Sequence, residues 1–189
     1  MDLTSHASVA EFFREVLTDA FKNQGVDTSQ PTEFYLVNLL ADFAKTPMDD
    51  EPLALKLANA ANAPPDTRVR HLKDVGDTSL YISGFFADSL QRKLVDVDYY
   101  IQLGGAAYSE LARYFRGYRQ SDVFGDVYDE LYAKFPRFVD VLAEISERSS
   151  MTSNTGVVQL YERWLRTGSE RVAQRLREQG VLPRKTELQ

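Results

Sequence analysis

The chain has 189 residues, of which 43% are hydrophobic and none is cysteine, and its formal net charge is −6. Its length suits one domain with a full hydrophobic core, and its composition excludes a wholly disordered protein. The absence of cysteine excludes disulfides, thiol catalysis and thiolate metal sites, and the acidic balance disfavours nonspecific binding to nucleic acid. The N-terminal stretch MDLTSHASVAEFFREVL has no basic start, and no window approaches the roughly 20 apolar residues of a membrane span. We therefore expect a cytoplasmic protein without a membrane segment.

Helical periodicity dominates the N-terminal part of the chain. An apolar stripe predicts a first helix over residues 8–23, with Gly25 just past its end. Pro31 suits the first turn of a second helix that is apolar on most sides, and Pro47 stops it. The stretch MDDEPLALKLANAANAPP predicts a short third helix, because acidic residues precede it and a double proline ends it.

The middle of the chain is predicted to form the centre of the fold. The segment DTRVRHLKDVG ends at Gly76, and Asp77 is placed to cap a helix over 77–95, so we expect a corner between two helices there. Gly84 lies inside this helix, where glycine costs about 1 kcal/mol relative to alanine unless another element approaches closely. A further helix is expected over 97–118, in which the glycines of QLGGAAY allow close packing.

The C-terminal part is expected to contain two more helical stretches. A helix from Ser121 should break or kink near Pro136 and then resume. Small polar residues predict a loop over 149–156, followed by a basic helix over 157–180 that is the element most able to detach. The sequence thus predicts an all-α fold: a single domain over 1–189, built as a compact orthogonal or irregular bundle of about seven or eight helices.

Familiar catalytic and metal-binding motifs are not found in the sequence. His6 and His71 are the two histidines, and neither has the acidic neighbours of di-iron bundles or zinc hydrolases. No Gly-x-Ser-x-Gly elbow or phosphate-binding glycine loop is present. We therefore predict no catalytic residue, no metal site and no cofactor.

The strongest candidate for a site is an aromatic and acidic segment within GDTSLYISGFFADSLQRKLVDVDYY. Asp96 and Asp98 could bind a cation or act as acid and base, but at a helix start we favour a structural role that complements the helix dipole. We expect Asp96 to cap the helix, and Asp98 is left open between the two roles. Tyrosines nearby either form the edge of the core or line a pocket or partner-binding groove. The candidate ligand-binding or partner-binding residues are Tyr81, Phe85, Arg92, Asp96, Asp98, Tyr100 and Tyr108.

Charge is unevenly distributed along the chain. The segment from Arg163 to Lys185 contains seven basic and two acidic residues, which gives it a net charge of +5. The rest of the chain therefore has a net charge of −11. This pattern is either a solvated helix face on an acidic body or a surface for an acidic partner. The candidate partner-binding residues of this basic helix are Arg163, Arg166, Arg171 and Arg175.

One segment carries a resemblance. The stretch HLKDVGDTSLYISGFFADSLQRKLVDVDYYIQLGGAAYSEL, above all its parts GDTSLYISGFF and LVDVDYY, resembles a family of uncharacterised bacterial proteins. The resemblance covers about residues 70–111. It implies a bacterial cytoplasmic protein with an all-helical fold, and it implies no activity and no functional residue.

Two functions from different classes follow as hypotheses. The leading one is a non-enzymatic helical interaction or adaptor protein that binds another protein through an aromatic groove or the basic C-terminal helix. The alternative is a small-molecule pocket between the helices at 77–95 and 97–118, binding an apolar or metal-assisted ligand and open to a catalytic role. We expect no nucleic acid or membrane partner, and aromatic helices of this kind are also compatible with a homodimer.

Overall fold

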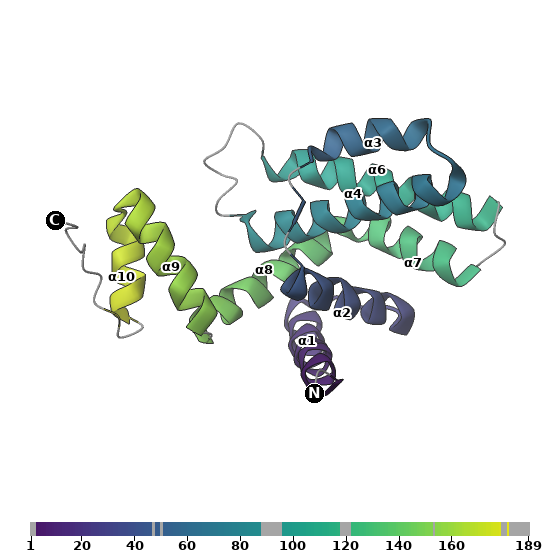
Figure 1. The fold of residues 1–189 in the computed structure, drawn as a ribbon. Helices are drawn as coiled ribbons and strands as arrows, with labels where there is room; N and C mark the ends of the chain where they lie inside the picture. The colour runs from purple at the N-terminus through teal and green to yellow at the C-terminus, as the bar shows by residue number, and fades with distance from the viewer. Residues whose placement is uncertain are drawn as a thin grey trace. The chain divides into compact units, whose positions relative to one another are not determined.

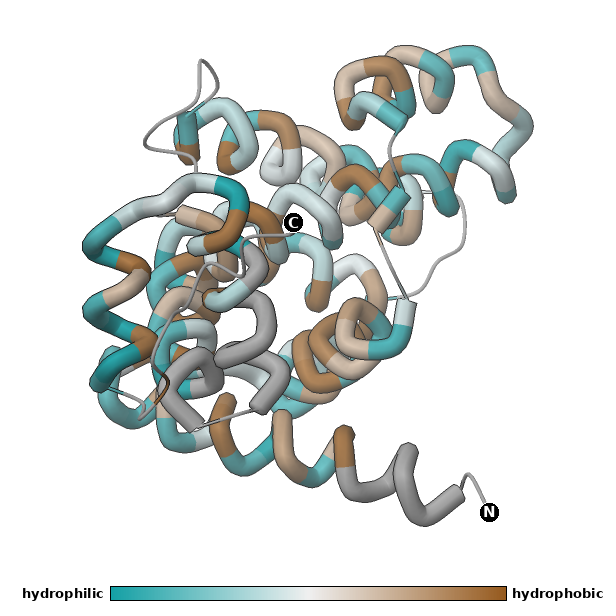
Figure 2. The backbone as a smooth tube through the Cα atoms, turned by 60° about the vertical axis from the view of Figure 1, so that its left-hand side comes forward, coloured by the Kyte–Doolittle hydropathy of each residue, from teal (hydrophilic) through white to brown (hydrophobic). Residues whose placement is uncertain are grey.

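A computed structural model describes residues 3–46, 48–49, 51–87, 96–117, 122–152, 154–178 and 181 (Figure 1). These residues form nine helices and no strand, which confirms the all-α prediction. The chain divides into an N-terminal unit, Met1–Ile145, and a C-terminal unit, Ser146–Gln189, where a single domain over 1–189 was predicted. None of the described helices holds an apolar stretch long enough to cross a membrane. Figure 2 shows why, since hydrophobic and hydrophilic residues alternate along nearly every helix.

The N-terminal unit begins with two helices that pack against each other, α1 (Leu3–Gln24) and α2 (Gln30–Lys45). Ser29 caps α2 by accepting a hydrogen bond from the Thr32 amide, and the proline in the first turn of α2 lies where its missing N–H is not needed. Leu36, Val37, Leu39 and Leu40 are buried on α2, so this helix is enclosed on most sides, as its composition predicts.

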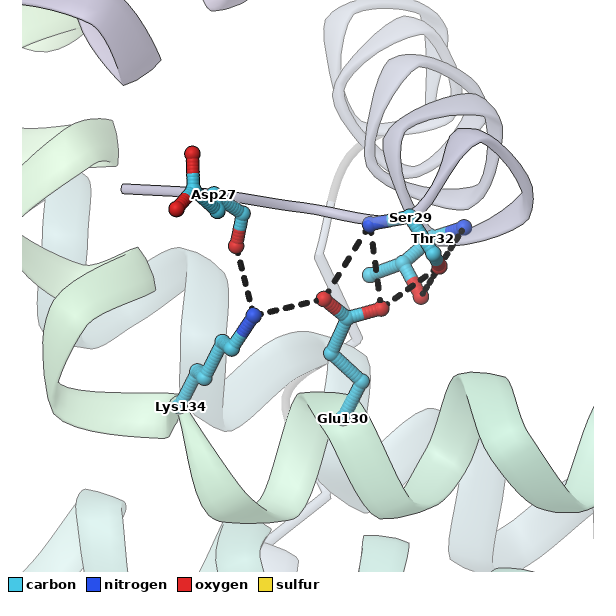
Figure 3. A network of polar contacts seen from close by, with 5 residues as sticks. All are labelled: Asp27, Ser29, Thr32, Glu130 and Lys134. Carbon is cyan, nitrogen blue, oxygen red and sulfur yellow. Dashed lines mark hydrogen bonds and ion pairs between the residues drawn. The ribbon is translucent and has the colours of Figure 1, made fainter. Parts of the chain in front are cut away.

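Glu130 of α7 (Asp122–Ala133) and Lys134, which follows that helix, hold the start of α2 in place (Figure 3). Glu130 accepts hydrogen bonds from the Ser29 amide at 3.1 Å and from the Ser29 hydroxyl at 2.6 Å. Lys134 donates to Glu130 at 2.9 Å and to the Asp27 carbonyl at 2.5 Å. Desolvation raises the pKa of Glu130, but hydrogen bonds from Ser29, Thr32 and Lys134 outweigh it and lower that pKa to about 2.

The predicted corner at residue 76 is wrong, because α4 (Pro65–Phe85) runs through it as one helix. The buried side of α4 faces α6 (Val97–Gly117), and these two helices share the most extensive contact in the fold. A Cβ on Gly76 would lie 2.4 Å from Cε1 of Tyr108, so this glycine makes room for a side chain of α6. Asp77 follows it inside the helix and is therefore no cap. The short helix α3 (Leu53–Ala61) packs on α4, where buried Lys56 pairs with Asp74.

Glycines also explain the close approach of neighbouring helices in the core. A Cβ on Gly84 would lie 2.4 Å from Cβ of Leu142 in α8 (Phe135–Thr152), which confirms Gly84 as a close-packing position. A Cβ on Gly104 would lie 2.6 Å from Cβ of Ser79, which is too close for a side chain. A Cβ on Gly105 would lie 3.6 Å from Cδ2 of Tyr132, an ordinary contact distance. The largest fully buried side chains of the unit are Tyr108, Phe135, Phe138, Leu17, Leu36, Leu40, Leu72, Leu80, Leu111, Leu131, Leu142 and Ile145.

The C-terminal unit differs from the prediction in two respects. The loop expected over 149–156 is wrong, since α8 reaches Thr152 and α9 (Asn154–Thr167) begins two residues later, with residue 153 outside the described residues. The single basic helix over 157–180 is instead a hairpin of α9 and α10 (Glu170–Glu178). Gly168 has φ +60°, a left-handed conformation that ends α9, and its amide bonds the Trp164 carbonyl at 2.7 Å.

Candidate functional site

A carboxylate is buried in the middle of α4, that of Asp77, which is 6% exposed. Its Oδ1 accepts a hydrogen bond from the hydroxyl of Tyr35 in α2 at 2.5 Å and from that of Tyr108 in α6 at 2.8 Å. Its Oδ2 pairs with Nζ of Lys73, one turn earlier, at 2.5 Å. Three helices therefore meet at one carboxylate.

Burial controls the protonation of this cluster. Desolvation raises the pKa of Asp77, while the charge and hydrogen bond of Lys73 and the bonds from both tyrosines lower it. Desolvation, and then the charge of Asp77, raise the pKa of Tyr35 and of Tyr108 well above the ordinary value. The same two causes raise the pKa of Tyr128, whose ring lies 5.9 Å from that of Tyr108, to about 12. The phenols thus remain protonated donors, and the cluster joins three helices.

The aromatic candidates of α4 form a separate stack. The ring of Tyr81 lies 4.3 Å from that of Phe43 and 4.7 Å from that of Phe85, stacked on both, and Phe86 meets its edge at 5.8 Å. Burial raises the pKa of the Tyr81 hydroxyl. Tyr81 is half-buried, so this stack reaches the surface as one aromatic edge.

The two aspartates take different roles at the start of α6. Asp96 accepts a hydrogen bond from the Tyr99 amide at 3.1 Å, which confirms it as the cap of this helix. Asp98 is exposed in the first turn, and Tyr100 is half-buried with its ring beside Tyr99. Arg92 lies outside the described residues. The structure therefore brings only Tyr108, of these candidates, into the polar cluster around Asp77.

A groove of about 560 Å³ opens between α3, α6 and α7. Leu57 and Ala61 line it from α3, Tyr132 lines it from α7, and α6 contributes Ala106, Ser109, Glu110 and Arg113. These four residues of α6 fall at helical spacing, so they form one stripe along that helix. The groove shares α6 with the pocket predicted between 77–95 and 97–118, but its other walls are α3 and α7 instead of the helix expected over 77–95.

The C-terminal hairpin presents the predicted arginines. Its small core consists of Trp164, Val172, Ala173 and Leu176. Arg166, Arg171 and Arg175 are exposed and Arg163 is half-buried. Within the described part of the chain none of these four makes an ion pair or a side-chain hydrogen bond, whereas Arg177 pairs with Glu170 at 2.7 Å. Their charges are therefore available to a partner.

No protein-family model, no curated protein and no solved structure matches this chain. The resemblance over residues 70–111 thus stays a prediction. Among the residues that the structure describes, no group of three or more His, Asp or Glu side chains is placed to hold a metal ion.

Proposed function

We propose that this protein is a non-enzymatic helical interaction protein whose C-terminal hairpin binds the acidic surface of another protein. The observation that carries the proposal is the set of exposed arginines without ion pairs, Arg166, Arg171 and Arg175, in a chain whose net charge is −6. A guanidinium binds a carboxylate through two parallel hydrogen bonds, so such a set favours a carboxylate-rich partner.

The charge of the two units supports an acidic partner. The C-terminal unit has eight basic and five acidic residues, a net charge of +3, while the N-terminal unit has 14 basic and 23 acidic residues, a net charge of −9. The positive charge is therefore concentrated on a short segment. Such a local field accelerates association with a surface of opposite sign, even where the whole chain is acidic.

The hairpin also offers an apolar anchor among its arginines. Leu165, beside Arg166, is 49% exposed, although the hairpin buries its neighbour Trp164. The core of the hairpin is small, and helices of this length are marginally stable without further burial. A partner that covers Leu165 and pairs with Arg166 would supply both buried apolar area and charge neutralisation.

A comparative pulldown tests the proposal. The wild type, the hairpin variant R166Q/R171Q/R175Q and the control variant R14Q/K45Q/R70Q serve as baits in lysate of the native host. The control removes three charges from exposed positions of the N-terminal unit, so both variants change the net charge equally. Fluorescence of Trp164, the single tryptophan, verifies that the hairpin is folded in each bait.

We expect the wild type and the control to retain a stoichiometric protein with an acidic surface that elutes at raised salt, and the hairpin variant to lose it. Retention by the hairpin variant would contradict the proposal, as would a wild type that recovers no stoichiometric partner. A second copy of this chain as the retained partner would identify a homodimer instead. Loss of the partner after nuclease treatment would indicate nucleic acid and would also contradict it.

A further inference from the structure

The groove between α3, α6 and α7 combines an apolar floor with three polar side chains, those of Ser109, Arg113 and Tyr132, that have no polar partner among the described residues. Ala61 and Ala106 leave space where larger side chains would fill it, and Leu57 adds apolar surface beside them. Its volume of about 560 Å³ lies within the usual range of small-molecule sites, roughly 300–1,000 Å³. The groove therefore suits an apolar body of small-molecule size.

The net charge at the groove is positive when Arg68, which pairs with the lining residue Glu110, is counted. Glu110 is its one acidic lining residue, and Arg68 of α4 lies 3.4 Å from that carboxylate and neutralises it. Arg113, one turn further along α6, is exposed and pairs with no acidic side chain among the described residues. One guanidinium charge thus remains unneutralised beside the apolar floor.

Two hydroxyl groups complete the polar side. Ser109 lies one turn before Arg113 on the same stripe of α6, and Tyr132 extends from α7 with 51% of its side chain exposed. Within the described residues neither hydroxyl bonds another group of the protein. A guanidinium with two hydroxyl donors is a combination that recognises an anion, and a planar carboxylate fits the guanidinium best.

From this arrangement we infer that the groove binds a small amphiphilic carboxylate. Its apolar chain or ring covers Leu57, Ala61 and Ala106, and its carboxylate is held by Arg113 with hydrogen bonds from Ser109 and Tyr132. The site is independent of the C-terminal hairpin, since all of its residues belong to the N-terminal unit. It also differs from a site for inorganic anions, because the apolar floor contributes to binding.

Octanoate is the probe for this site, and octanol is the matched neutral compound. Titration is followed by backbone amide NMR of the full chain at pH 7. Wild-type protein should bind octanoate with a dissociation constant on the order of 1 mM, as expected for a ligand of this size, with shifts gathered on α3, α6 and Tyr132. Octanol should bind at least about tenfold more weakly, because it lacks the charge that Arg113 recognises.

Three variants separate the two parts of the site. R113Q should weaken octanoate about tenfold and leave octanol unchanged, whereas A106L should fill the floor and weaken both compounds. R70Q removes an exposed arginine of α4 outside the groove and should bind like the wild type. Each variant is accepted only if its amide spectrum shows the wild-type fold away from the groove.

Several results would overturn the inference. These are an absence of saturable shifts with octanoate at millimolar concentration, equal affinity for octanol, or octanoate affinity that R113Q leaves intact. Shifts that gather on the C-terminal hairpin would equally reject it, because they would report a general attraction of anions to arginine. Inorganic phosphate binding the wild type as well as octanoate would show that the apolar floor plays no part.

Discussion

Replacing Glu130 with glutamine tests how the start of α2 is held against α7. The wild-type carboxylate has a folded-state pKa of about 2, against an ordinary value of 4.5. Because the folded-state pKa is lowered, the ionised group stabilises the fold above pH 4.5, and this contribution is lost as the pH falls from 4.5 toward 2. Glutamine keeps the size of the side chain and an acceptor for Ser29, but it removes the charge that Lys134 neutralises.

The magnitude follows from the size of the pKa shift. At about 1.36 kcal/mol per pKa unit, lowering a pKa from 4.5 to about 2 corresponds to at most about 3.4 kcal/mol of stability. Lys134 is 38% exposed, so water screens part of this interaction. We therefore expect E130Q to lower the free energy of unfolding by about 1–2 kcal/mol at pH 7, and the difference from the wild type to vanish near pH 2.

Urea unfolding at a series of pH values between 7 and 2 measures this difference. Near-UV circular dichroism of tyrosine reports the N-terminal unit, which holds nine of the ten tyrosines, while Trp164 fluorescence reports the C-terminal unit separately. E11Q, at an exposed position of α1, is the control and should run parallel to the wild type. A gap between E130Q and the wild type that stays constant down to pH 2, or that is absent at pH 7, would refute the reasoning.

Three further predictions concern the core of the N-terminal unit. D77N removes the charge paired with Lys73 and should cost about 1–3 kcal/mol in urea unfolding at pH 7; a neutral effect would mean that the cluster is held by packing alone. G84L places a side chain against Leu142 and should lower the free energy of unfolding by about 1–3 kcal/mol, so an unchanged melting temperature would show an open face. Above pH 10, Tyr35, Tyr108 and Tyr128 lose their phenolic protons in the unfolded chain but keep them in the folded chain. The free energy of unfolding should therefore fall by up to about 4 kcal/mol per pH unit, or about 1.36 kcal/mol for each of the three groups. A free energy of unfolding that is unchanged at pH 11 would contradict the raised pKa values.

Helices with a broad apolar face were predictable because their signal is local. Leu36, Leu39 and Leu40 are spaced at the period of a helix, so they lie on one face of α2. The structure buries this face. The cap at Asp96 was predictable for the same reason, since donor and acceptor lie within one turn. Gly84 could be assigned to close packing, although its partner Leu142 could not be named from the sequence.

The error at Gly76 and Asp77 has a tertiary cause. Glycine followed by aspartate indicates the end of one helix and the cap of the next. The neighbouring residues in the sequence give no signal against this interpretation. The helix continues through residue 76 because of contacts with Tyr108. The ring of Tyr108 occupies the space beside Gly76, and its hydroxyl donates a hydrogen bond to Asp77. A signal for the buried carboxylate was nevertheless present: Asp77 follows Lys73 by four residues and precedes the apolar Leu80 on a helix.

Helical periodicity could predict neither the groove nor the turn of the hairpin, for different reasons. The groove needs Leu57, Ala106 and Tyr132 from three helices, and no local pattern brings these together. In the hairpin, the high density of arginines is readable from the sequence, and their role in binding stays a prediction, but the turn at Gly168 was missed. A glycine inside a helical pattern is compatible both with a tolerated interior position and with a left-handed end, and only its φ of +60° distinguishes them.

The cluster around Asp77 also indicates which surface residues can be substituted without loss of the fold. Apolar contacts are non-directional, whereas the hydrogen bonds from Tyr35 and Tyr108 to one carboxylate oxygen of Asp77 require a defined placement of α2 and α6 beside α4. A slip of one residue would leave a buried charge with fewer donors, at a cost of several kcal/mol, so we infer that this cluster selects the register while the apolar core supplies stability. Neither the groove residue Arg113 nor the arginines of the hairpin contact the cluster. Their substitution should therefore change binding and leave the register intact, which is what makes the R113Q and R166Q/R171Q/R175Q variants informative about function.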